Sequence, residues 1–243
     1  MSGIFIVGTD TGVGKTVVGA GLAGIFREEG VNVGVMKPVA TAGVSFQERL
    51  ISPDVLFMCA AARLPVEAEL VNPYCYELPA APLVASRGQE PVSVHVIKEC
   101  FATLRKRHSI IVVEGIGGLL VPLSDVLMLP GLISELDVPV LVVASASLGT
   151  INHSLLTIQC ARSAGLNVIG LVMNRASRRA ASTIGLVEET NPSIVSKLGN
   201  VLFLGTVEEG TGIDVDACRL GNTVEIVRRG VDWRKILNLI RKA

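Results

Sequence analysis

The feature that most constrains the fold of this chain is a glycine-rich loop close to its start. Residues 4–7 (Ile-Phe-Ile-Val) predict a short buried strand, residues 8–16 are Gly-Thr-Asp-Thr-Gly-Val-Gly-Lys-Thr, and residues 17–26 predict a packed helix. A strand, a glycine-rich turn and Gly-Lys-Thr at a helix start are the context of a phosphate-binding loop. Backbone N–H groups and the helix dipole attract a polyphosphate there. The sequence therefore predicts a nucleotide site.

The loop departs from the strict pattern Gly-x-x-x-x-Gly-Lys-Ser/Thr, because Thr9 occupies the first glycine position and Gly8 comes one residue early. In such loops the lysine, here Lys15, reaches the terminal phosphates, and the hydroxyl, here that of Thr16, binds Mg²⁺. The alternative is a glycine-rich turn that binds nothing, but Gly-Lys-Thr places a cation and a hydroxyl beside an anion site. The residues expected to contact nucleotide are Gly12, Val13, Gly14, Lys15, Thr16 and Val17.

The composition indicates a nucleotide-binding domain rather than a nucleic-acid or membrane protein. A chain of 243 residues is long enough for one large α/β domain, which is expected to span residues 1–243. Lys plus Arg and Asp plus Glu both total 22, so no net charge attracts nucleic acid or anionic lipid. No apolar run approaches the ~20 residues that a membrane span needs.

Cysteine and histidine usage indicates a reducing compartment and gives no sign of zinc. The 5 cysteines are odd in number and widely spaced, with no Cys-x-x-Cys pair, which predicts free thiols rather than a disulfide framework. The 3 histidines show no metal-ligand spacing. Since a strand, and not a basic and apolar leader, begins the chain, the expected location is the cytoplasm.

Apolar runs alternate with helix-like stretches along the chain. The expected strands are 3–7, 31–36, 110–114, 138–144, 167–173 and 201–204. The expected helices are 15–29, 54–62, 93–107, 151–164, 178–197 and 233–242, and the proline-rich segment 64–92 is expected to form loops and short turns. Strands rich in Val, Ile and Leu without polar alternation are covered on both faces. The pattern predicts an α/β fold with a doubly wound, mostly parallel sheet flanked by helices.

Polar residues and glycines follow several predicted strands, where ligands bind in such sheets. Glu114 ends an apolar strand, and its carboxylate suits Mg²⁺ opposite Thr16, with a structural salt bridge as the alternative. Lys37 is expected to stabilise phosphate charge, or else to be a solvated strand tip. Asn174 offers a donor and an acceptor to a base edge, but is also an ordinary strand-to-loop residue. The glycines that either admit a ligand or form a tight turn are Gly115, Gly117 and Gly118.

Together these segments closely resemble the dethiobiotin synthetase family over essentially all of residues 1–205. The matching segments, in family order and spacing, are 8–16, 37–41 (Lys-Pro-Val-Ala-Thr), Asp54, 71–74 (Val-Asn-Pro-Tyr), 113–118 (Val-Glu-Gly-Ile-Gly-Gly), 122–125 (Pro-Leu-Ser-Asp), 148–153 (Leu-Gly-Thr-Ile-Asn-His) and 173–175 (Met-Asn-Arg). The irregular loop supports the resemblance, because this family carries Gly-Thr-Asp-Thr-x-Val-Gly-Lys-Thr. The resemblance implies that ATP drives the conversion of 7,8-diaminopelargonic acid and CO₂ into dethiobiotin, through a carbamate and a carbamic–phosphoric anhydride.

The resemblance also implies roles for the matching residues. The catalytic cations would be Lys15 and Lys37, and the Mg²⁺ ligands would be Thr16, Asp54 and Glu114. The ATP contacts beyond the loop and these ligands would be Gly115, Gly117, Asn174 and Arg175. The diamine contacts would be Thr11, Lys37, Thr41, Gly117, Gly118, Leu148, Gly149, Thr150 and Asn152. In this family the segment 148–152 comes from the partner subunit, which implies a homodimer.

The sequence departs from the family pattern in three places. Ala42 stands where the family usually has glycine, which restricts the backbone of that loop. Residues 205–208 (Gly-Thr-Val-Glu) replace Gly-x-Ile-Pro, which alters the expected C-terminal contacts to the base. Asn174-Arg175 replaces the Asn-Asp of some members, which is expected to loosen base selectivity.

Other functions on the same nucleotide fold are less consistent with the chain. A cobyrinic acid diamide synthase would carry a glutaminase domain, for which the residues after 205 leave no room. A partition or positioning ATPase would carry a second lysine near the start of the loop, where this chain has Asp10. Its surface tail would be basic or amphipathic, and 233–242 is partly basic but more typical of a packing helix. Lys37 and the carboxylates argue against a non-catalytic nucleotide sensor.

Overall fold

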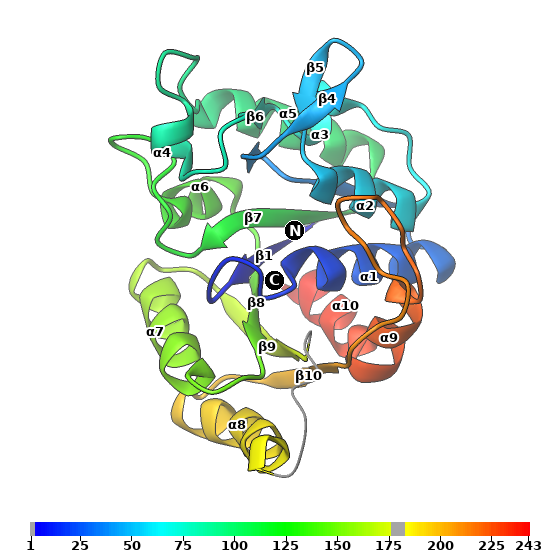
Figure 1. The fold of residues 1–243 in the computed structure, drawn as a ribbon, viewed down its shortest axis with the longest axis vertical. Coiled ribbons are helices and arrows are strands. Elements are labelled where there is room, and N and C mark those ends of the chain that lie inside the picture. The colour runs from blue at the N-terminus through cyan, green and yellow to red at the C-terminus, as the bar shows by residue number, and fades with distance from the viewer. Residues whose placement is uncertain (1–2, 176–182) are drawn as a thin grey trace.

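A parallel sheet lies between two layers of helices (Figure 1). The computed structural model describes residues 3–175 and 183–243. The six sheet strands lie in the order β10-β9-β8-β1-β7-β2, and each pair of neighbours is parallel. Their bounds are β1 (Gly3–Gly8), β2 (Val33–Met36), β7 (Ile110–Gly118), β8 (Val140–Ser145), β9 (Val168–Asn174) and β10 (Phe203–Val207). The predicted doubly wound parallel sheet is therefore confirmed.

The two helix layers follow from the handedness of the connections, because parallel crossovers are right-handed and the chain reverses its direction along the sheet after β2. One face carries α1 (Lys15–Glu28), α2 (Pro53–Ala62), α9 (Thr223–Gly230) and α10 (Trp233–Lys242). The other carries α5 (Val94–Arg107), α6 (Leu129–Leu136), α7 (Thr150–Ser163) and α8 (Thr183–Leu198). Among the described helices, none is long and apolar enough to cross a membrane.

Helix α1 is buried by its neighbours α2 and α9, and small residues make this close packing possible. A Cβ added at Gly21 would overlap the side chain of Val227 in α9, and one at Gly24 would overlap Val224. Interiors are packed too densely to absorb such an overlap without movement. The glycines of this helix therefore fix how closely α9 approaches the helix that carries Lys15.

The proline-rich segment holds only short elements, as the sequence predicts. They are α3 (Ala68–Val71), β6 (Tyr74–Cys75) and α4 (Pro82–Ala85), and β6 pairs with β3 (Val39–Ala40) in a separate parallel ladder. An antiparallel hairpin of β4 (Val44–Phe46) and β5 (Arg49–Ile51) projects beside it.

The structure also differs from the sequence prediction in several elements. The expected strand at 31–36 begins at Val33, and the strand expected at 110–114 continues through Gly118. The helices α6 and α9 lie where none was predicted. The expected helix 178–197 corresponds to α8, and its first residues, 178–182, lie outside the described part of the chain.

Candidate active site

The carboxyl ends of neighbouring strands frame the glycine-rich loop. β1 lies between β7 and β8 in the sheet. The chain runs from β1 toward the edge formed by β2, and from β8 toward the edge formed by β10. Such a switch point opens a crevice outside the strand ends, where ligands bind in open α/β sheets. The loop of residues 9–14 leaves β1 at this point, and α1 begins directly after it.

Gly14 brings the loop against the end of β9. Its φ is 94°, in the left-handed region, and a Cβ there would overlap the amide nitrogen of Asn174. Only glycine accepts both conditions. The Asn174 Nδ2 atom donates a hydrogen bond of 3.1 Å to the carbonyl oxygen of Val13. Asn174, whose contact with a base stays a prediction, therefore holds the loop in place.

Lys15 is buried at the start of α1, and its ammonium lies between two carbonyl groups. Its Nζ atom donates hydrogen bonds to Gly117 O at 2.8 Å and to Asp10 O at 3.1 Å. Burial lowers the pKa of Lys15 to about 8, although the negative charge of Glu114 opposes this effect. The predicted phosphate-binding cation therefore ties the loop to the end of β7.

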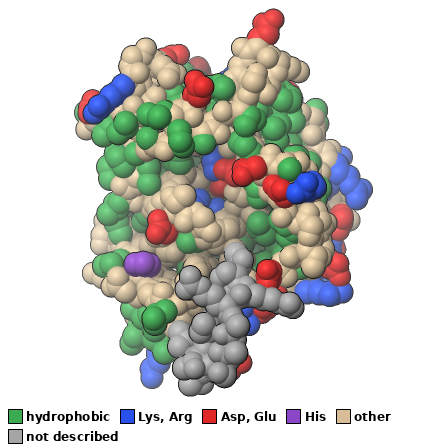
Figure 2. Space-filling view, viewed as in Figure 1, with side chains coloured by type: hydrophobic (Ala, Val, Ile, Leu, Met, Phe, Trp, Pro, Cys, Tyr) green, Lys and Arg blue, Asp and Glu red, His purple; other side chains and the backbone are tan. Residues whose placement is uncertain are grey.

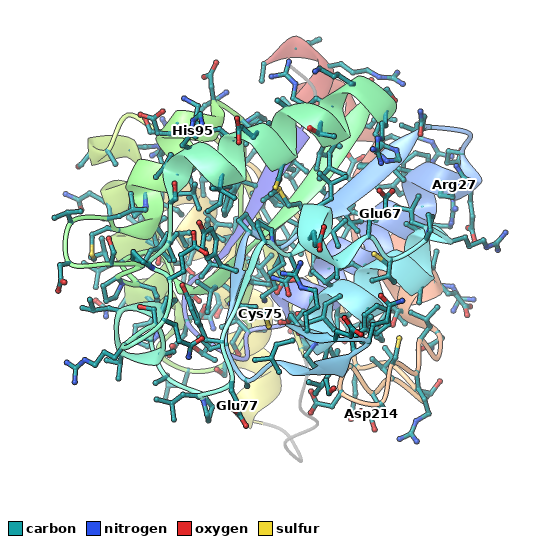
Figure 3. The ribbon with its side chains drawn as sticks, turned by 90° about the horizontal axis from the view of Figure 1, so that it is seen from above. Arg27, Glu67, Cys75, Glu77, His95 and Asp214 are labelled. Atoms are coloured by element: carbon teal, nitrogen blue, oxygen red, sulfur yellow. The ribbon has the colours of Figure 1, made fainter. Side chains whose placement is uncertain are left out.

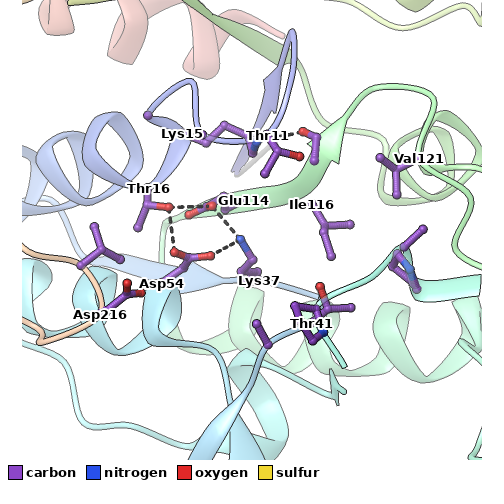
Figure 4. A pocket seen from close by; sticks show the side chains of 18 of the residues that line it. Thr11, Lys15, Thr16, Lys37, Thr41, Asp54, Glu114, Ile116, Val121 and Asp216 are labelled. Carbon is purple, nitrogen blue, oxygen red and sulfur yellow. Dashed lines mark hydrogen bonds and ion pairs between the residues drawn. The ribbon is translucent and has the colours of Figure 1, made fainter. Parts of the chain in front are cut away.

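Thr16, Lys37, Asp54 and Glu114 form one hydrogen-bonded cluster on the floor of the crevice (Figure 4). Lys37 Nζ donates to Glu114 Oε1 at 2.7 Å and to Asp54 Oδ2 at 2.5 Å. The Thr16 hydroxyl lies 2.9 Å from Glu114 Oε1 and 3.0 Å from Asp54 Oδ1. Four residues from four segments of the sequence thus meet as the predicted site requires.

The charges of this cluster depend on one another. Burial alone would lower the pKa of Lys37, but the carboxylates of Glu114 and Asp54 outweigh it and raise that pKa. Burial would raise the pKa of Asp54, but Lys37 lowers it. Burial raises the pKa of the fully enclosed Glu114, against the opposing effect of Lys37. Lys37 therefore stays protonated, and it stabilises the carboxylates that surround it.

The position of Lys37 is fixed from behind by a fully buried asparagine. The Asn72 Nδ2 atom donates a hydrogen bond of 2.7 Å to the carbonyl oxygen of Lys37, and Asn72 Oδ1 accepts one of 2.9 Å from Ser52 N. Ser52 in turn caps α2, because its hydroxyl accepts a hydrogen bond from the Asp54 backbone N–H. The side chain of Asn72 therefore fixes the backbone position of Lys37 directly and that of Asp54 through Ser52.

The cluster of Thr16, Lys37, Asp54 and Glu114 lines a cleft of about 740 Å³. Figure 2 shows it as a hollow near the centre of the face, with basic and acidic side chains gathered in it. The predicted loop and cluster residues that line it are Thr11, Gly12, Gly14, Lys15, Thr16 and Val17, with Lys37, Asp54 and Glu114. The other predicted residues that line it are Thr41, Gly117 and Asn174.

Further residues line the cleft without having been predicted. They include Ala42, the segment 79–82, Ile116 and Val121, and also Val215 and Asp216 from the loop between β10 and α9. The Pro-Ala-Ala-Pro segment at 79–82 carried a loop signal but no sign of function. Asp216, near Asp54 in Figure 4, does not come directly after a strand and matches no motif, so only the folded chain brings it here. Ala42 has a φ of 56°, the strained conformation that glycine would take without cost.

Several predicted residues do not line this cleft, and their roles stay predictions. Gly115 packs against Phe5, and Gly118 faces the backbone of Thr9 and Asp10. Arg175 forms an ion pair of 2.9 Å with Glu208. In the segment 148–152, Leu148 is 88% exposed, Gly149 is the N-cap residue that precedes α7, and the buried Thr150 hydroxyl contacts Ser154.

The acidic residues of the site are suited to a cation that takes its remaining ligands from the phosphates of a nucleotide. Within the described residues, no group of three or more His, Cys, Asp or Glu could hold a metal by itself. Asp54 and Glu114 supply two carboxylates and Thr16 supplies a hydroxyl, and the buried Glu114 Oε2 atom has no hydrogen-bond partner in the described structure. Mg²⁺ typically takes one or two carboxylates and completes its shell with phosphate and water.

The fold and the loop define a nucleotide-binding protein of the P-loop class. Residues 2–215 match the family model described as an AAA domain. The ATP-dependent dethiobiotin synthetase of Bacillus licheniformis is 37% identical over 206 residues, which cover 84% of this chain and 85% of that protein. That of Bacillus velezensis is 32% identical over 240 residues and covers 98% of both chains. The chain belongs to the dethiobiotin synthetase family, a family of ATP-dependent ligases of biotin biosynthesis.

Solved structures add information on the fold alone. The MinD cell division protein of Aquifex aeolicus superposes with a TM-score of 0.62, covers 98% of both chains and is 10% identical. So low an identity transfers no activity. Asp10, which stands where a positioning ATPase is expected to carry a second lysine, accepts the Thr11 N–H at 2.7 Å and contributes its carbonyl to Lys15.

Proposed function

We propose that this protein is an ATP-dependent dethiobiotin synthetase whose residues 1–243 act as one domain. The observation that carries the proposal is the cluster of Thr16, Lys37, Asp54 and Glu114 beneath the glycine-rich loop, in a chain related to these ligases over most of its length. The substrates would be 7,8-diaminopelargonic acid, CO₂ and ATP. The free state of the cysteines supports a reducing compartment such as the cytoplasm.

In the proposed reaction one amine takes up CO₂ as a carbamate and loses a proton. A carbamate oxygen attacks the γ-phosphorus of ATP, which forms a carbamic–phosphoric anhydride and releases ADP. The second amine then attacks the anhydride carbon, loses a proton and expels phosphate, which closes the ureido ring. These steps need in-line positioning and positive charge more than covalent help from the protein.

The cations of the site supply that charge in the proposed mechanism. Lys37 is protonated and held at the floor of the cleft, so its ammonium would face the carbamate and the transferred phosphoryl group. Lys15 would exchange the carbonyl oxygens of Asp10 and Gly117 for phosphate oxygens. The Thr11 and Thr41 side chains line the same cleft and would bind the diamine.

Mg²⁺, when bound, would neutralise charge on the β- and γ-phosphates. Thr16, Asp54 and Glu114 are the residues that would hold it. The support for this assignment is the buried Glu114 Oε2 atom, an acceptor that makes no hydrogen bond within the described structure, together with its neighbouring carboxylate and hydroxyl.

We further propose that the protein acts as a homodimer. The segment 148–152 does not line the cleft of its own chain, and Leu148 and Leu156 of this region are 88% and 59% exposed. Asn152 of the partner subunit, with its neighbours at the start of α7, would then bind the substrate's carboxylate through backbone N–H groups.

The test is phosphate release by the purified protein with MgATP and bicarbonate, with and without 7,8-diaminopelargonic acid. We expect release that depends on the diamine, with dethiobiotin detected by mass spectrometry. Hydrolysis that ignores the diamine would retain the nucleotide site and reject the substrate. A P-loop switch ATPase, or another ligase of this fold, would then be the better assignment.

A further inference from the structure

Asn191, in the middle of helix α8, is buried although the proposed reaction does not use it. Its exposed fraction is only 3%, and it does not line the nucleotide cleft. Many polar side chains outside that cleft are exposed, such as Glu67, Glu77 and His95, which Figure 3 labels. A buried amide costs free energy unless it is hydrogen-bonded, so the partner of Asn191 indicates what the side chain does.

The amide of Asn191 holds the loop that connects β8 to α7. The Asn191 Nδ2 atom donates a hydrogen bond of 3.0 Å to the carbonyl oxygen of Ala146, the residue directly after β8. The backbone N–H of Ala146 donates another bond of 3.0 Å to the carbonyl oxygen of Asn174, at the end of β9. Ala146 is therefore held from α8 on one side and from the sheet on the other.

Ala146 is the only buried residue of this loop, which spans residues 146–149. It is 2% exposed, whereas residues 147–149 are exposed. The N-cap residue of α7, Gly149, has no side chain that could bond the first turn of the helix. The Thr150 N–H bonds the carbonyl of Ser147 at 3.2 Å, which joins the exposed part of the loop to the helix. The position of the α7 start therefore depends on how Ala146 is held.

The α7 start is also the segment that is proposed to act in the site of the partner subunit. Residues 148–152 do not line the cleft of their own chain. Backbone N–H groups bind a carboxylate well only at hydrogen-bond distance and near-linear geometry, so a small displacement of this segment weakens the contact. Without the amide of Asn191, the buried carbonyl of Ala146 loses its donor, and the loop has to move to find another.

We propose that Asn191 is a positioning residue for the substrate site of the partner subunit. Through Ala146, its amide sets the backbone N–H groups at the start of α7 that bind the carboxylate of the substrate. Asn191 itself does not touch the substrate. The proposal rests on the proposed function and on the homodimer, and it places the effect of Asn191 in the other subunit's site rather than in its own.

Steady-state kinetics test this role. Asn191→Ala should raise the KM for 7,8-diaminopelargonic acid about tenfold or more, because the carboxylate lies far from the reacting amines and contributes binding alone. The kcat and the dissociation constant of ADP should change less than about twofold. Ser193→Ala is the matched control, because this exposed residue of α8 bonds only the carbonyl of Thr190 in its own helix. If Asn191→Ala does not fold, Asn191→Leu removes the donor but keeps a branched side chain of the same number of atoms.

A mixed dimer shows in which subunit's site Asn191 acts. Asn191→Ala chains are exchanged with a large excess of Lys37→Ala chains, so that nearly every Asn191→Ala chain has a Lys37→Ala partner. The sites that keep Lys37 then receive an α7 start that native Asn191 holds. We expect the native KM for the diamine at these sites. A KM that stays raised would place the effect within the same subunit, through Asn174, and would overturn the proposal.

Hydrogen exchange tests the contact without turnover. The backbone N–H groups of Ala146, Thr150 and His153 are each hydrogen-bonded in the native chain. In Asn191→Ala they should exchange about tenfold or more faster, whereas those of the loop at 8–16 should not change. Ser193→Ala should exchange like the native chain.

Unchanged exchange at these three N–H groups, or an unchanged KM for the diamine, would overturn the proposal. If the native protein does not turn over the diamine at all, the proposed function fails. The exchange measurement then still decides whether Asn191 holds the start of α7.

Discussion

The ammonium of Lys37 donates a hydrogen bond of 2.7 Å to Glu114 Oε1 in the floor of the nucleotide cleft, and both side chains are buried. The pair joins the end of β2 to β7, two neighbouring strands of the sheet. Because each charge compensates the other, a variant of either residue affects stability as well as catalysis, and the two effects have to be separated.

Lys37→Ala should lower the turnover rate by about 10²-fold or more, while nucleotide binding is largely retained. The variant also leaves Glu114 buried without its cation, so we expect a lower melting temperature. The double variant Lys37→Ala/Glu114→Gln removes that unpaired charge and should regain stability but not activity. Steady-state kinetics, calorimetry with ADP and thermal melts measure these quantities. Unimpaired turnover in Lys37→Ala would exclude a catalytic role.

Glu114→Gln should raise the Mg²⁺ concentration needed for half-maximal activity about tenfold or more, because an amide oxygen is a weaker ligand than a carboxylate. Asp125→Asn, an acidic residue outside the cleft lining, is the control and should leave the Mg²⁺ titration unchanged. The measurement is initial rate against free Mg²⁺ at saturating ATP. An unchanged titration in Glu114→Gln would assign this carboxylate a structural role only.

Nucleotide affinity should fall as the pH rises above about 8, the pKa of Lys15 in the nucleotide-free protein. A phosphate bound to this ammonium favours the charged form and raises its pKa, so binding takes up a proton wherever free Lys15 has lost one. The affinity contributed by Lys15 is therefore complete below that pKa and declines above it. Calorimetry with ADP across this range measures the decline. Lys15→Arg keeps its charge, and a decline of the same size in that variant would point to another group.

Gly21→Ala should destabilise the protein by about 1–3 kcal/mol, because the added methyl group overlaps Val227 of α9. In the background Val227→Ala the same change should cost much less, since the space is then free. Denaturant melts of the four proteins form a double-mutant cycle, which isolates the interaction between these two positions. Additive costs would show that α1 and α9 do not meet closely here.

Mixing two inactive variants tests the proposed dimer. If the backbone N–H of Asn152 acts in the site of the partner subunit, a mixed dimer of Lys37→Ala and Asn152→Pro chains contains one intact site, because proline lacks this N–H and is tolerated in the first turn of α7. After random exchange of equal amounts, about a quarter of the native activity should return. Each variant alone is the control. No recovery, with dimers present by light scattering, would place both residues in the same subunit's site.

Local patterns predict the parts of this fold whose signals are strong. The loop at 8–16, the apolar strand cores and the long helices α1, α5 and α10 all lie where the sequence indicates. The helix α6 was missed although Leu129, Leu132, Ile133 and Leu136 have helical spacing, because Pro130 and Gly131 resemble a turn. Proline is tolerated there because it stands in the first turn, where its missing N–H would be unpaired anyway.

The sequence by itself determined that a phosphate-binding loop follows the first strand, that Lys37 directly follows another strand and Glu114 lies in a third, and which family shares these motifs. Only the tertiary structure decided that Lys37 bonds both Asp54 and Glu114, that Asn72 holds it from behind, and that Asp216 lies at the same cleft. The reason is physical. A motif records the backbone conformation and side chains of a few neighbouring residues, whereas charge pairing and burial depend on how strands far apart in sequence are aligned in the sheet.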